Sequence, residues 1–442
     1  MQAIAPEITD PTPHGIAAAI ARLITSGELA PGDRLPTVRD LAADLGISPA
    51  TVSHAWQALS GVGLIISRGR SGSFVRPTPK TWLPPRARGM AGVPDARLDL
   101  STGTPDPALL PSLTLALTRV SLSASTPSYL EVPVIPELEH SLRASWPGDP
   151  EGLTVVDGAL DAISRSLEQV AHFGDRVIVE DPGYPPLLDL LDQFHAERVP
   201  VAMDEHGIRP DKLVEALSLR AAAVVLQPRA QNPTGVSMTV ERAKELARIL
   251  RTHRNASATI VIEDDHSGQI SSASEVSLAR WMPERVIHIR SFSKSHGPDL
   301  RIAAVGGPAQ LVDRIVARRM LGPGWTSRML QRILNDLLTD FTSIAEVSDA
   351  RRVYHGRQRE LADALRRNGY PAQASDGVNT WIAVDDERSA VVQLAAAGIR
   401  VAGGGAFIAD PREGSDHIRV TVGLLREDFK TVGAAIAEAA RA

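Results

Sequence analysis

The sequence predicts an α/β protein made of two unequal parts and a linker. From about residue 98, short apolar, β-branched runs alternate with longer helical ones, which is typical of a largely parallel sheet covered by helices on both faces. Residues 1–76 instead show helical spacing and a hairpin pattern. Because 442 residues exceed one ordinary domain, we expect a head at 1–76 and a body at 98–442, with a smaller α+β lobe from about 345.

The intervening residues 77–97 are rich in Pro, Gly and Arg and have no periodicity. This composition predicts a semi-extended linker. We expect a simple spacer, with contact between its basic residues and DNA as the alternative.

The composition excludes several kinds of site. The chain has no cysteine, so disulfides, thiolate nucleophiles and cysteine-bound zinc are excluded. Its 12 histidines show no H-E-x-x-H spacing, and we expect no metal site. The N-terminal residues lack the features of a secretion signal, and no apolar run has the length of a membrane span. We therefore expect a cytoplasmic protein without membrane contact.

The net charge of −5 conceals a local basic segment. Residues 1–44 contain three arginines and six acids, whereas residues 45–94 contain six basic residues and no acid. A basic segment in an acidic chain favours a local anionic partner.

The first part contains three helical runs. HGIAAAIARLITSGEL carries Ile16 and Ile20 at helical spacing, and PGDRLP after it predicts a turn. VRDLAADLG predicts a short second helix that ends at Gly46. The third run begins with Ser48 as its N-cap and Pro49 at the first helical position.

A basic hairpin follows the third helix. LIISRGRSGSFV predicts two strands whose turn carries Arg68 and Arg70, so the segment has the pattern of a winged helix-turn-helix. In the third helix the small polar residues Thr51, Ser53 and His54 lie off the apolar face, which suits a helix that approaches base edges in the major groove. A generic three-helix bundle remains the alternative.

The stretch ITSGELAPGDRLPTVRDLAADLGISPATVSHAWQALSGVGLIISRGRSGSFV resembles the GntR-type DNA-binding domain over nearly its whole length. The resemblance implies that Arg39, Thr51, Ser53 and the wing contact operator DNA, with the wing arginines on phosphates or in the minor groove. Pro49 stands where the family commonly has an arginine, which removes one expected DNA contact.

In the second part, polar residues follow the predicted strands. Tyr184 follows VIVE, Asn232 follows VVLQP, and Asp264 and His266 end the run TIVIEDDH. Lys294 follows RVIHIR. Ligands of such sheets bind beyond the carboxyl ends of the strands, so we expect these residues to lie close together.

This set meets the requirements of pyridoxal 5′-phosphate (PLP). A lysine condenses with its aldehyde only when neutral, which requires burial or a neighbouring cation. The pyridine nitrogen needs a carboxylate, the ring an aromatic face, and the phenolic oxygen a donor. The helix start after Gly158 and the residues Ser291, Ser293 and Arg301 offer a phosphate cradle. Taken singly, each of these residues has a purely structural alternative.

The set resembles fold type I, class I/II aminotransferases, and the joined head and body look like the MocR subfamily of bacterial GntR-type regulators. The resemblance covers almost the whole chain. It implies that Lys294 forms the Schiff base, Asp264 pairs with the pyridine nitrogen, Asn232 reaches the phenolic oxygen and Tyr184 stacks on the ring. It also implies a phosphate site at Ser291, Ser293, Arg301 and the backbone of Ala159 and Leu160, a tyrosine (Tyr129) that reaches the partner subunit's phosphate, and a carboxylate clamp at Arg419.

Two positions depart from the family pattern. His266 replaces a tyrosine that donates to the phenolic oxygen, and we expect a neutral imidazole to donate there instead. Leu160 replaces a polar residue at the phosphate, so its contact is through the backbone. Both changes weaken the case for an efficient transaminase.

We therefore expect a homodimeric, PLP-dependent regulator that binds operator DNA and senses PLP, or an amino acid or amine, through formation of an external aldimine. The first alternative is an active aminotransferase with an attached DNA-binding domain. The second is a DNA-binding protein that has lost its cofactor.

Overall fold

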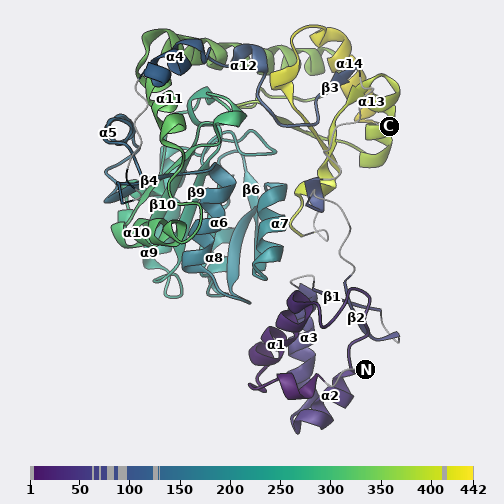
Figure 1. Cartoon of the computed structure of the whole chain (residues 1–442). Helices are drawn as coiled ribbons and strands as arrows, with labels where there is room; N and C mark the ends of the chain where they lie inside the picture. Colours follow the sequence, from purple (N-terminus) through teal and green to yellow (C-terminus); the bar gives the residue numbers. More distant parts are fainter. Residues whose placement is uncertain are drawn as a thin grey trace.

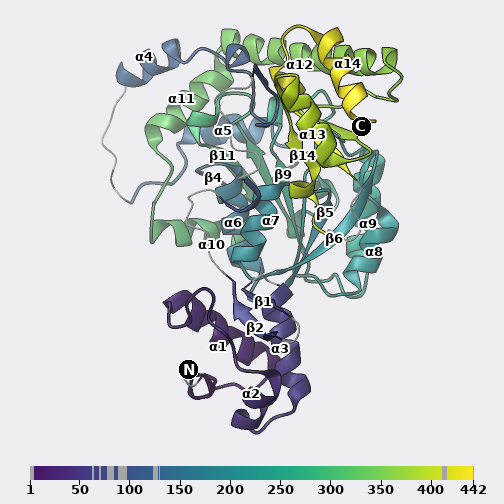
Figure 2. The same cartoon turned by 90° about the vertical axis from the view of Figure 1, so that its right-hand side faces the viewer.

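The computed structural model describes residues 4–61, 64–68, 71–76, 84–87, 97–122, 128, 130–410 and 416–441. Two expected site residues, Arg70 and Tyr129, lie outside the described residues. A small N-terminal head stands below a larger body in both views (Figures 1 and 2). Among the described residues, no helix combines the length and the apolar character needed to cross a lipid bilayer.

The head is a three-helix unit with a two-stranded hairpin. Its elements are η1 (Ala5–Glu7), α1 (Pro13–Ser26), α2 (Val38–Leu45), α3 (Pro49–Gly61), β1 (Ile65–Ser67) and β2 (Ser73–Val75). The Thr12 hydroxyl caps α1 and the Thr37 hydroxyl caps α2, each accepting from a backbone N–H of the first turn. Gly46, at φ 66°, ends α2 as expected. The strands β1 and β2 pair antiparallel, which confirms the winged helix-turn-helix.

The body is built around an eight-stranded sheet in the order β4-β11-β10-β9-β8-β5-β6-β7. Its strands are β4 (Gly152–Val156), β5 (Arg176–Asp181), β6 (Glu197–Asp204), β7 (Gly207–Ile208), β8 (Ala223–Leu226), β9 (Ile260–Asp265), β10 (Val286–Ser291) and β11 (Ala303–Gly307). Pairing is parallel from β10 through β9, β8 and β5 to β6. The strands β11 and β7 run antiparallel to their neighbours. The predicted, largely parallel α/β sheet is thus confirmed.

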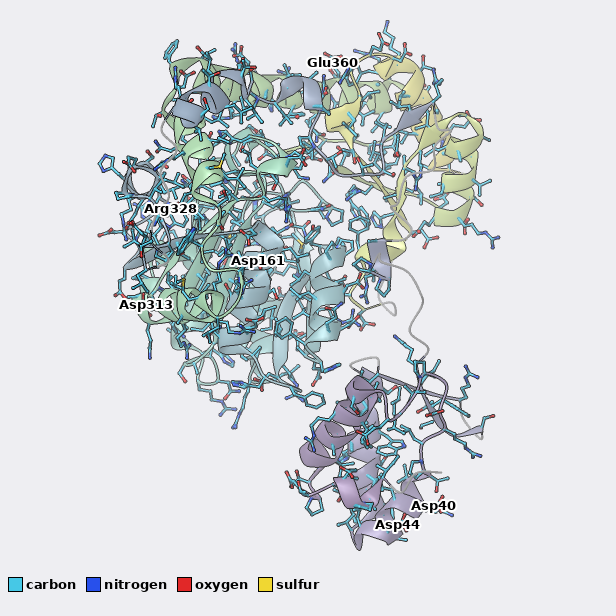
Figure 3. All side chains as sticks on the ribbon, viewed as in Figure 1. Asp40, Asp44, Asp161, Asp313, Arg328 and Glu360 are labelled. Carbon is cyan, nitrogen blue, oxygen red and sulfur yellow. The ribbon has the colours of Figure 1, made fainter. Side chains whose placement is uncertain are left out.

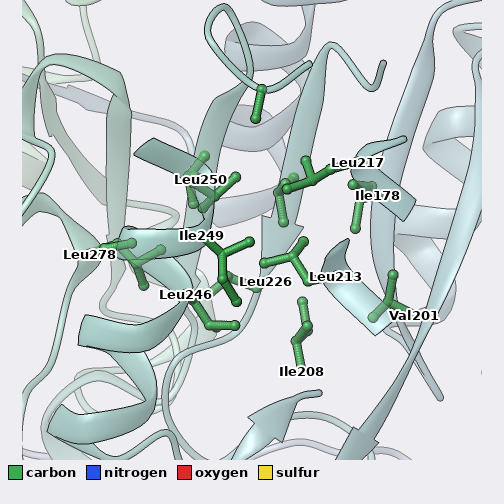
Figure 4. Packing of buried hydrophobic residues seen from close by; sticks show 14 of the residues in the cluster. Ile178, Val201, Ile208, Leu213, Leu217, Leu226, Leu246, Ile249, Leu250 and Leu278 are labelled. Atoms are coloured by element: carbon green, nitrogen blue, oxygen red, sulfur yellow. The ribbon is translucent and has the colours of Figure 1, made fainter. Parts of the chain in front are cut away.

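Helices cover both faces of this sheet. On one face α8 (Pro210–Leu217) and α9 (Val240–Thr252) bury Leu213, Leu246 and Leu250 in a cluster that includes Leu226 of β8 (Figure 4). On the other face lie α6 (Ala159–Val170), α7 (Pro185–Gln193) and α10 (Ala309–Met320). Every residue of β8 and β10 is buried, which explains the wholly apolar sequence of β8 and the apolar residues Val286, Ile287 and Ile289 of β10.

The smaller lobe has its own antiparallel sheet, β12 (Thr380–Ala383), β15 (His417–Val420) and β14 (Ala402–Gly403), together with α13 (Glu387–Ala396) and α14 (Phe429–Ala439). The 27-residue helix α12 (Phe341–Arg367) leads into it, after α4 (Thr114–Leu122), α5 (Pro136–Ala144) and α11 (Arg328–Thr339). The strand β3 (Leu98–Asp99) pairs in parallel with β13 (Ile399–Arg400). The start of the body therefore lies in the small lobe, which the expected range from about residue 345 did not include.

Candidate cofactor site and DNA-binding surface

Four of the expected site residues follow four neighbouring parallel strands. Tyr184, Asn232, Asp264 and Lys294 come at or after the ends of β5, β8, β9 and β10. The pKa of Tyr184 rises to about 12, first because the phenol is buried and second because Asp264 lies near it. Parallel strands end at one edge of a sheet, and the structure places these side chains together there.

The surroundings of Lys294 increase the neutral fraction of its amine. Its Nζ donates to the Gly103 carbonyl oxygen. Burial lowers the pKa of Lys294 to about 8, and the positive charge of Arg419 lowers it further. A lysine of this kind can react with an aldehyde near neutral pH.

We expect the rate at which PLP combines with the apoprotein to rise with pH, with a midpoint near the Lys294 pKa of about 8. Roughly a tenth of such an amine is neutral at pH 7, against roughly one in 3000 of an ordinary lysine. The growth of visible absorbance after mixing, followed from about pH 6 to about pH 9.5, measures this profile. In Arg419→Gln the midpoint should move to higher pH, because the positive charge of Arg419 that lowers the Lys294 pKa is removed. A rate that still rises without a midpoint at about pH 9.5 in the unaltered protein would contradict the lowered pKa of Lys294.

Asp264 presents one free oxygen to the same site. Its Oδ2 accepts from Gln227 Nε2 at 2.8 Å, whereas its buried Oδ1 has no hydrogen-bond partner among the described residues. Burial raises the Asp264 pKa to about 6, and the Gln227 bond opposes this shift. The carboxylate is therefore largely ionised at neutral pH, and Oδ1 can accept from the N–H of a protonated pyridine ring.

Two supporting residues, Gln227 and Glu180, were missed in the sequence. Gln227 Oε1 accepts from the Asn232 N–H at 2.8 Å, so one amide positions both Asp264 and Asn232. Glu180 Oε1 accepts from the Gln227 N–H at 3.1 Å, and burial raises the Glu180 pKa to about 8. The available signal was a polar residue at the end of a buried apolar strand, as in VVLQ and VIVE.

Arg419 lies buried on β15 beside Asn232. Its Nη1 donates to Asn232 Oδ1 at 3.3 Å and its Nη2 to the Ser101 carbonyl oxygen, while its Nε has no partner among the described residues. A Cβ added at Gly103 would lie 2.9 Å from Arg419 Nη1, so glycine leaves room for the guanidinium. Since Asn232 Oδ1 is taken, its Nδ2 remains to donate to a cofactor hydroxyl.

The start of α6 forms the expected phosphate cradle. Gly158 has φ 107° and precedes the first helical residues Ala159 and Leu160, whose N–H groups have no acceptor within the helix. Arg301 Nη2 donates to the Asp157 carbonyl oxygen at 3.0 Å, and a Cβ at position 158 would lie 2.6 Å from that nitrogen. A larger residue than glycine would block the approach between this guanidinium and the helix start. A dianion fits here.

The serines near Lys294 differ in exposure. Ser291 ends β10 and is buried, and its Oγ accepts from the Ser293 N–H at 3.3 Å. Ser293 is half-buried. In the first turn of α6, Asp161 (Figure 3) pairs with Arg165 and Arg319, so its negative charge is compensated beside the cradle.

His266 has a different contact from the expected one. Its Nε2 lies 2.9 Å from the Ala230 carbonyl oxygen, to which it must donate. Burial lowers the His266 pKa to about 4, with Lys294 as the second cause, so the ring is neutral and carries one N–H. In this arrangement no N–H of His266 is left for a phenolic oxygen, and the donor role falls to Asn232.

One cluster among the described residues has the composition of a metal site, namely Asp265, Glu275 and His288. Asp265 is already paired with Arg229 at 2.5 Å, and Glu275 with Arg290 at 2.6 Å. These guanidiniums neutralise both carboxylates, so the cluster is better described as an ion-pair network than as a cation site.

The head exposes three of the five described residues that were expected to contact DNA. Arg39 in α2, His54 in α3 and Arg68 at the hairpin are exposed, and the Arg68 Cζ lies 5.4 Å from the centre of the Phe74 ring. Asp40 and Asp44 are also exposed on α2 (Figure 3), so phosphate contact by this helix depends on Arg39.

A groove of about 440 Å³ lies between α3 and the hairpin. Ser53, Gln57, Ser67 and Arg34 are among its lining residues, and Arg34 was not among the expected DNA contacts. Thr51 is half-buried, and its hydroxyl lies 3.0 Å from Ser48 Oγ at the start of α3.

Comparison with known proteins matches both parts. Residues 13–75 match the family model "Bacterial regulatory proteins, gntR family", and residues 96–436 match "Aminotransferase class I and II". The chain is 35% identical to the "Vitamin B6 salvage pathway transcriptional repressor PtsJ" of Salmonella typhimurium, over 97% of this chain and 98% of that protein. It is 27% identical to the "Probable rhizopine catabolism regulatory protein MocR" of Rhizobium meliloti, over 84% and 79%.

Among solved structures, LysN, the alpha-aminoadipate aminotransferase of Thermus thermophilus, has the same fold as the body. The TM-score is 0.69 at 21% identity, over 80% of this chain and 97% of that chain. Head and body together define a DNA-binding transcription regulator with an aminotransferase-like domain, a fold that typically binds PLP. The chain belongs to the MocR-type regulators of the GntR family. The family and fold predicted from the sequence are confirmed.

Proposed function

We propose that this regulator holds PLP at Lys294 and alters its DNA binding when PLP, or an amino acid or amine that reacts with it, occupies the body. One observation carries the proposal: the buried Asp264 Oδ1 without a partner lies at the same sheet edge as Lys294. An unpaired buried carboxylate oxygen is costly, which favours a ligand that supplies an N–H there. The name of the relative PtsJ, a vitamin B6 salvage repressor, supports a B6 compound as one signal.

When bound, PLP would supply an aldehyde carbon to which primary amines add. Lys294 would hold PLP through its partly neutral Nζ. Arg419 would bind the α-carboxylate of an amino acid through two parallel hydrogen bonds. Tyr184 would cover one face of the ring. Because Arg419 belongs to the small lobe, we expect ligand binding to close this lobe on the large one.

A second candidate function is a working aminotransferase, favoured by the presence of Lys294, Asp264 and Arg419 in one site. The bond between His266 and Ala230 and the apolar Leu160 weigh against it. Sustained transfer from an amino acid to a keto acid, lost in Lys294→Ala, would favour this candidate, whereas a single slow half-reaction would exclude it.

The decisive experiment is a spectral titration of the PLP-loaded protein with amino acids and amines. Each compound that shifts the visible band is then added to an operator-binding assay. We expect at least one compound to shift the band and change operator affinity. A protein without any visible band after PLP loading would be a regulator that has lost its cofactor, and the proposal would fail.

We further propose a homodimer that works in the cytoplasm, with residues 1–76 as the DNA-binding domain, 77–97 as the linker and 98–442 as the PLP-binding domain. Exposed apolar side chains support a subunit interface. Leu117 of α4, Leu321 after α10 and Phe341 at the start of α12 are 51%, 83% and 85% exposed. Tyr129, which lies outside the described residues, would reach the partner subunit's phosphate.

Arg39→Ala is expected to weaken operator binding about tenfold, or about 1.4 kcal/mol. The slope of the logarithm of the binding constant against the logarithm of the salt concentration should become less steep by about one. The reason is the exposure of Arg39 on an otherwise acidic α2. Binding is measured at several salt concentrations, with Arg22→Ala on α1 as the matched control. The visible PLP band should stay unchanged in both variants. Equal affinity of Arg39→Ala and the unaltered protein at every salt concentration would contradict the assignment.

A further inference from the structure

The linker is fastened to the body at one described point. Arg86 Nη1 donates to Asp189 Oδ1 at 2.7 Å and to Asp192 Oδ2 at 2.9 Å. The backbone N–H of Arg86 also donates to Asp189 Oδ2, at 3.1 Å. Asp189 and Asp192 lie one turn apart on α7. We call these three residues the linker clamp.

The linker clamp has the features of a specific contact. The Asp189 side chain is only 5% exposed, and that of Arg86 22%. The turn at Pro84 and Pro85, closed by an Ala87 N–H bond to the Pro84 carbonyl oxygen at 3.1 Å, presents both donors of Arg86 in one direction. If Arg86 left, the negative charge of the buried Asp189 carboxylate would have neither this partner nor full access to water. An acid in an exposed ion pair would instead be solvated. Arg86 is thus committed to the body and is not available to DNA.

The other end of α7 lies at the cofactor site. Tyr184 is the residue directly before this helix, about 12 Å along its axis from Asp192. The Gly183 N–H donates to the Phe407 carbonyl oxygen at 2.8 Å, and the Ala409 N–H to Asp181 Oδ1 at 2.9 Å. The small lobe therefore holds the loop from which α7 begins.

The same part of the small lobe touches the carboxylate clamp. The Arg419 Cζ lies 4.9 Å from the centre of the Phe407 ring. A continuous set of contacts thus runs from Arg419 through Phe407 and Gly183 to α7, and from α7 to the linker at Arg86. Figure 1 shows the linker turn and the yellow small lobe on the same side of the body, close to α7.

The head also contacts the body near the linker clamp. Phe173, between α6 and β5, packs against the apolar core of the head. Burial lowers the pKa of Arg198 on β6; the carboxylate of Asp192 opposes this shift, and the like charges of Arg86 and Arg76 add to it. Arg198 Nε lies 3.5 Å from Asp192 Oδ1. Asp192 therefore contacts two arginines, Arg86 of the linker and Arg198 of the body, whose like charges would otherwise repel each other.

We propose that the linker clamp transmits occupancy of the cofactor site to the head. Closure of the small lobe on a ligand shifts the loop at 181–184 and, with it, α7. This movement withdraws Asp189 and Asp192 from Arg86. The linker is then free, and the head leaves its contact with the body at Phe173. A ligand acts in this way only by binding one arrangement better than the other. This inference rests on the proposed function for its ligand and its DNA-binding output.

The first arm of the test needs no DNA. Trypsin cleaves after Arg86 only when the guanidinium leaves the linker clamp, so the cleavage rate reports the released population. In the full-length, PLP-loaded protein, Asp189→Asn/Asp192→Asn should accelerate cleavage at Arg86 about tenfold. Asp175→Asn, at an exposed acid of the same lobe, should not. An unchanged rate in the double variant, with its PLP band intact, would overturn the clamp. Loss of the PLP band in the double variant would indicate misfolding. In that case the rate of trypsin cleavage after Arg86 in the milder Asp192→Asn variant decides whether the linker clamp exists.

The second arm measures coupling as the ratio of operator affinities with and without a compound that shifts the PLP band. Arg86→Ala should bring this ratio to within about twofold of one, while the spectral titration stays unchanged. Lys80→Ala, which removes one positive charge from the same linker, should keep the full ratio. A full ratio in Arg86→Ala would overturn the coupling and leave the proposed function standing. No ligand response in the unaltered protein would overturn the proposed function together with the coupling, and the trypsin arm would still decide whether the linker clamp exists.

Discussion

Lys294→Ala is expected to abolish the visible band of the PLP-loaded protein and every response of operator binding to ligand. Lys294 is the amine that the site keeps partly neutral, at a pKa of about 8, and its Nζ lies between Gly103 and the sheet edge. Loss of its covalent bond should weaken PLP retention by about 100-fold or more, equivalent to about 3 kcal/mol. Absorbance after gel filtration and operator binding with and without ligand measure the two losses.

Lys212→Ala is the matched control, because Lys212 is exposed and paired only with a neighbour on α8, Glu215. It should leave both the band and the response unchanged. Operator affinity of Lys294→Ala should also match that of the unaltered protein prepared without PLP, since the head is intact. A visible band that persists in Lys294→Ala would contradict the role of this residue.

Asp264→Asn is expected to weaken PLP binding about 100-fold, because removing one partner of a buried pair costs about 3 kcal/mol or more. The Asn side chain can keep one bond to Gln227 but offers no charge to a pyridinium nitrogen. Equilibrium titration of the apoprotein with PLP measures the change. Asp175→Asn, at an exposed acid, should bind PLP normally.

The pH profile separates this role from a structural one. The Asp264 pKa is raised to about 6, so in the apoprotein the carboxyl group is neutral below that pH and ionised above it. PLP binding to the unaltered protein should therefore weaken as the pH falls through about 6. Asp264→Asn should lack this acidic limb. If PLP affinity falls equally below about pH 6 in both proteins, the fall is due to the titration of another group.

The sequence predicted the strand ends well for a physical reason. The strands β8, β9 and β10 are almost completely buried, so β8 is wholly apolar and β9 and β10 begin with apolar residues, which makes the polar residues at or after their ends conspicuous. Parallel pairing then brings residues that are 30 or more positions apart in the chain, such as Asp264 and Lys294, to one edge. The head was predictable because its caps and turns are local: Gly46 and Ser48 act within a few residues of their own positions.

The features of the site that the sequence did not predict depend on contacts between residues far apart in the chain. The bond between His266 and the Ala230 carbonyl and the bond between Gln227 and Asp264 join separate loops, and no spacing within either loop encodes them. The expected donation by His266 assumed that the imidazole keeps an N–H for the cofactor, whereas a backbone acceptor takes it. The linker composition likewise gave no sign of Asp189, 103 positions away from Arg86.

The pairing of β3 with β13 has a consequence for how the chain folds. Leu98 and Asp99 find their partners only at Ile399 and Arg400, some 300 residues later. Contacts this distant in sequence form late, because a long loop must close before they form. During synthesis the head, whose buried core comes entirely from its own residues, can fold as soon as it leaves the ribosome, whereas the small lobe must wait for nearly the whole chain. A nascent chain stalled before residue 399 would therefore carry a folded DNA-binding head on a body that cannot yet bind a ligand.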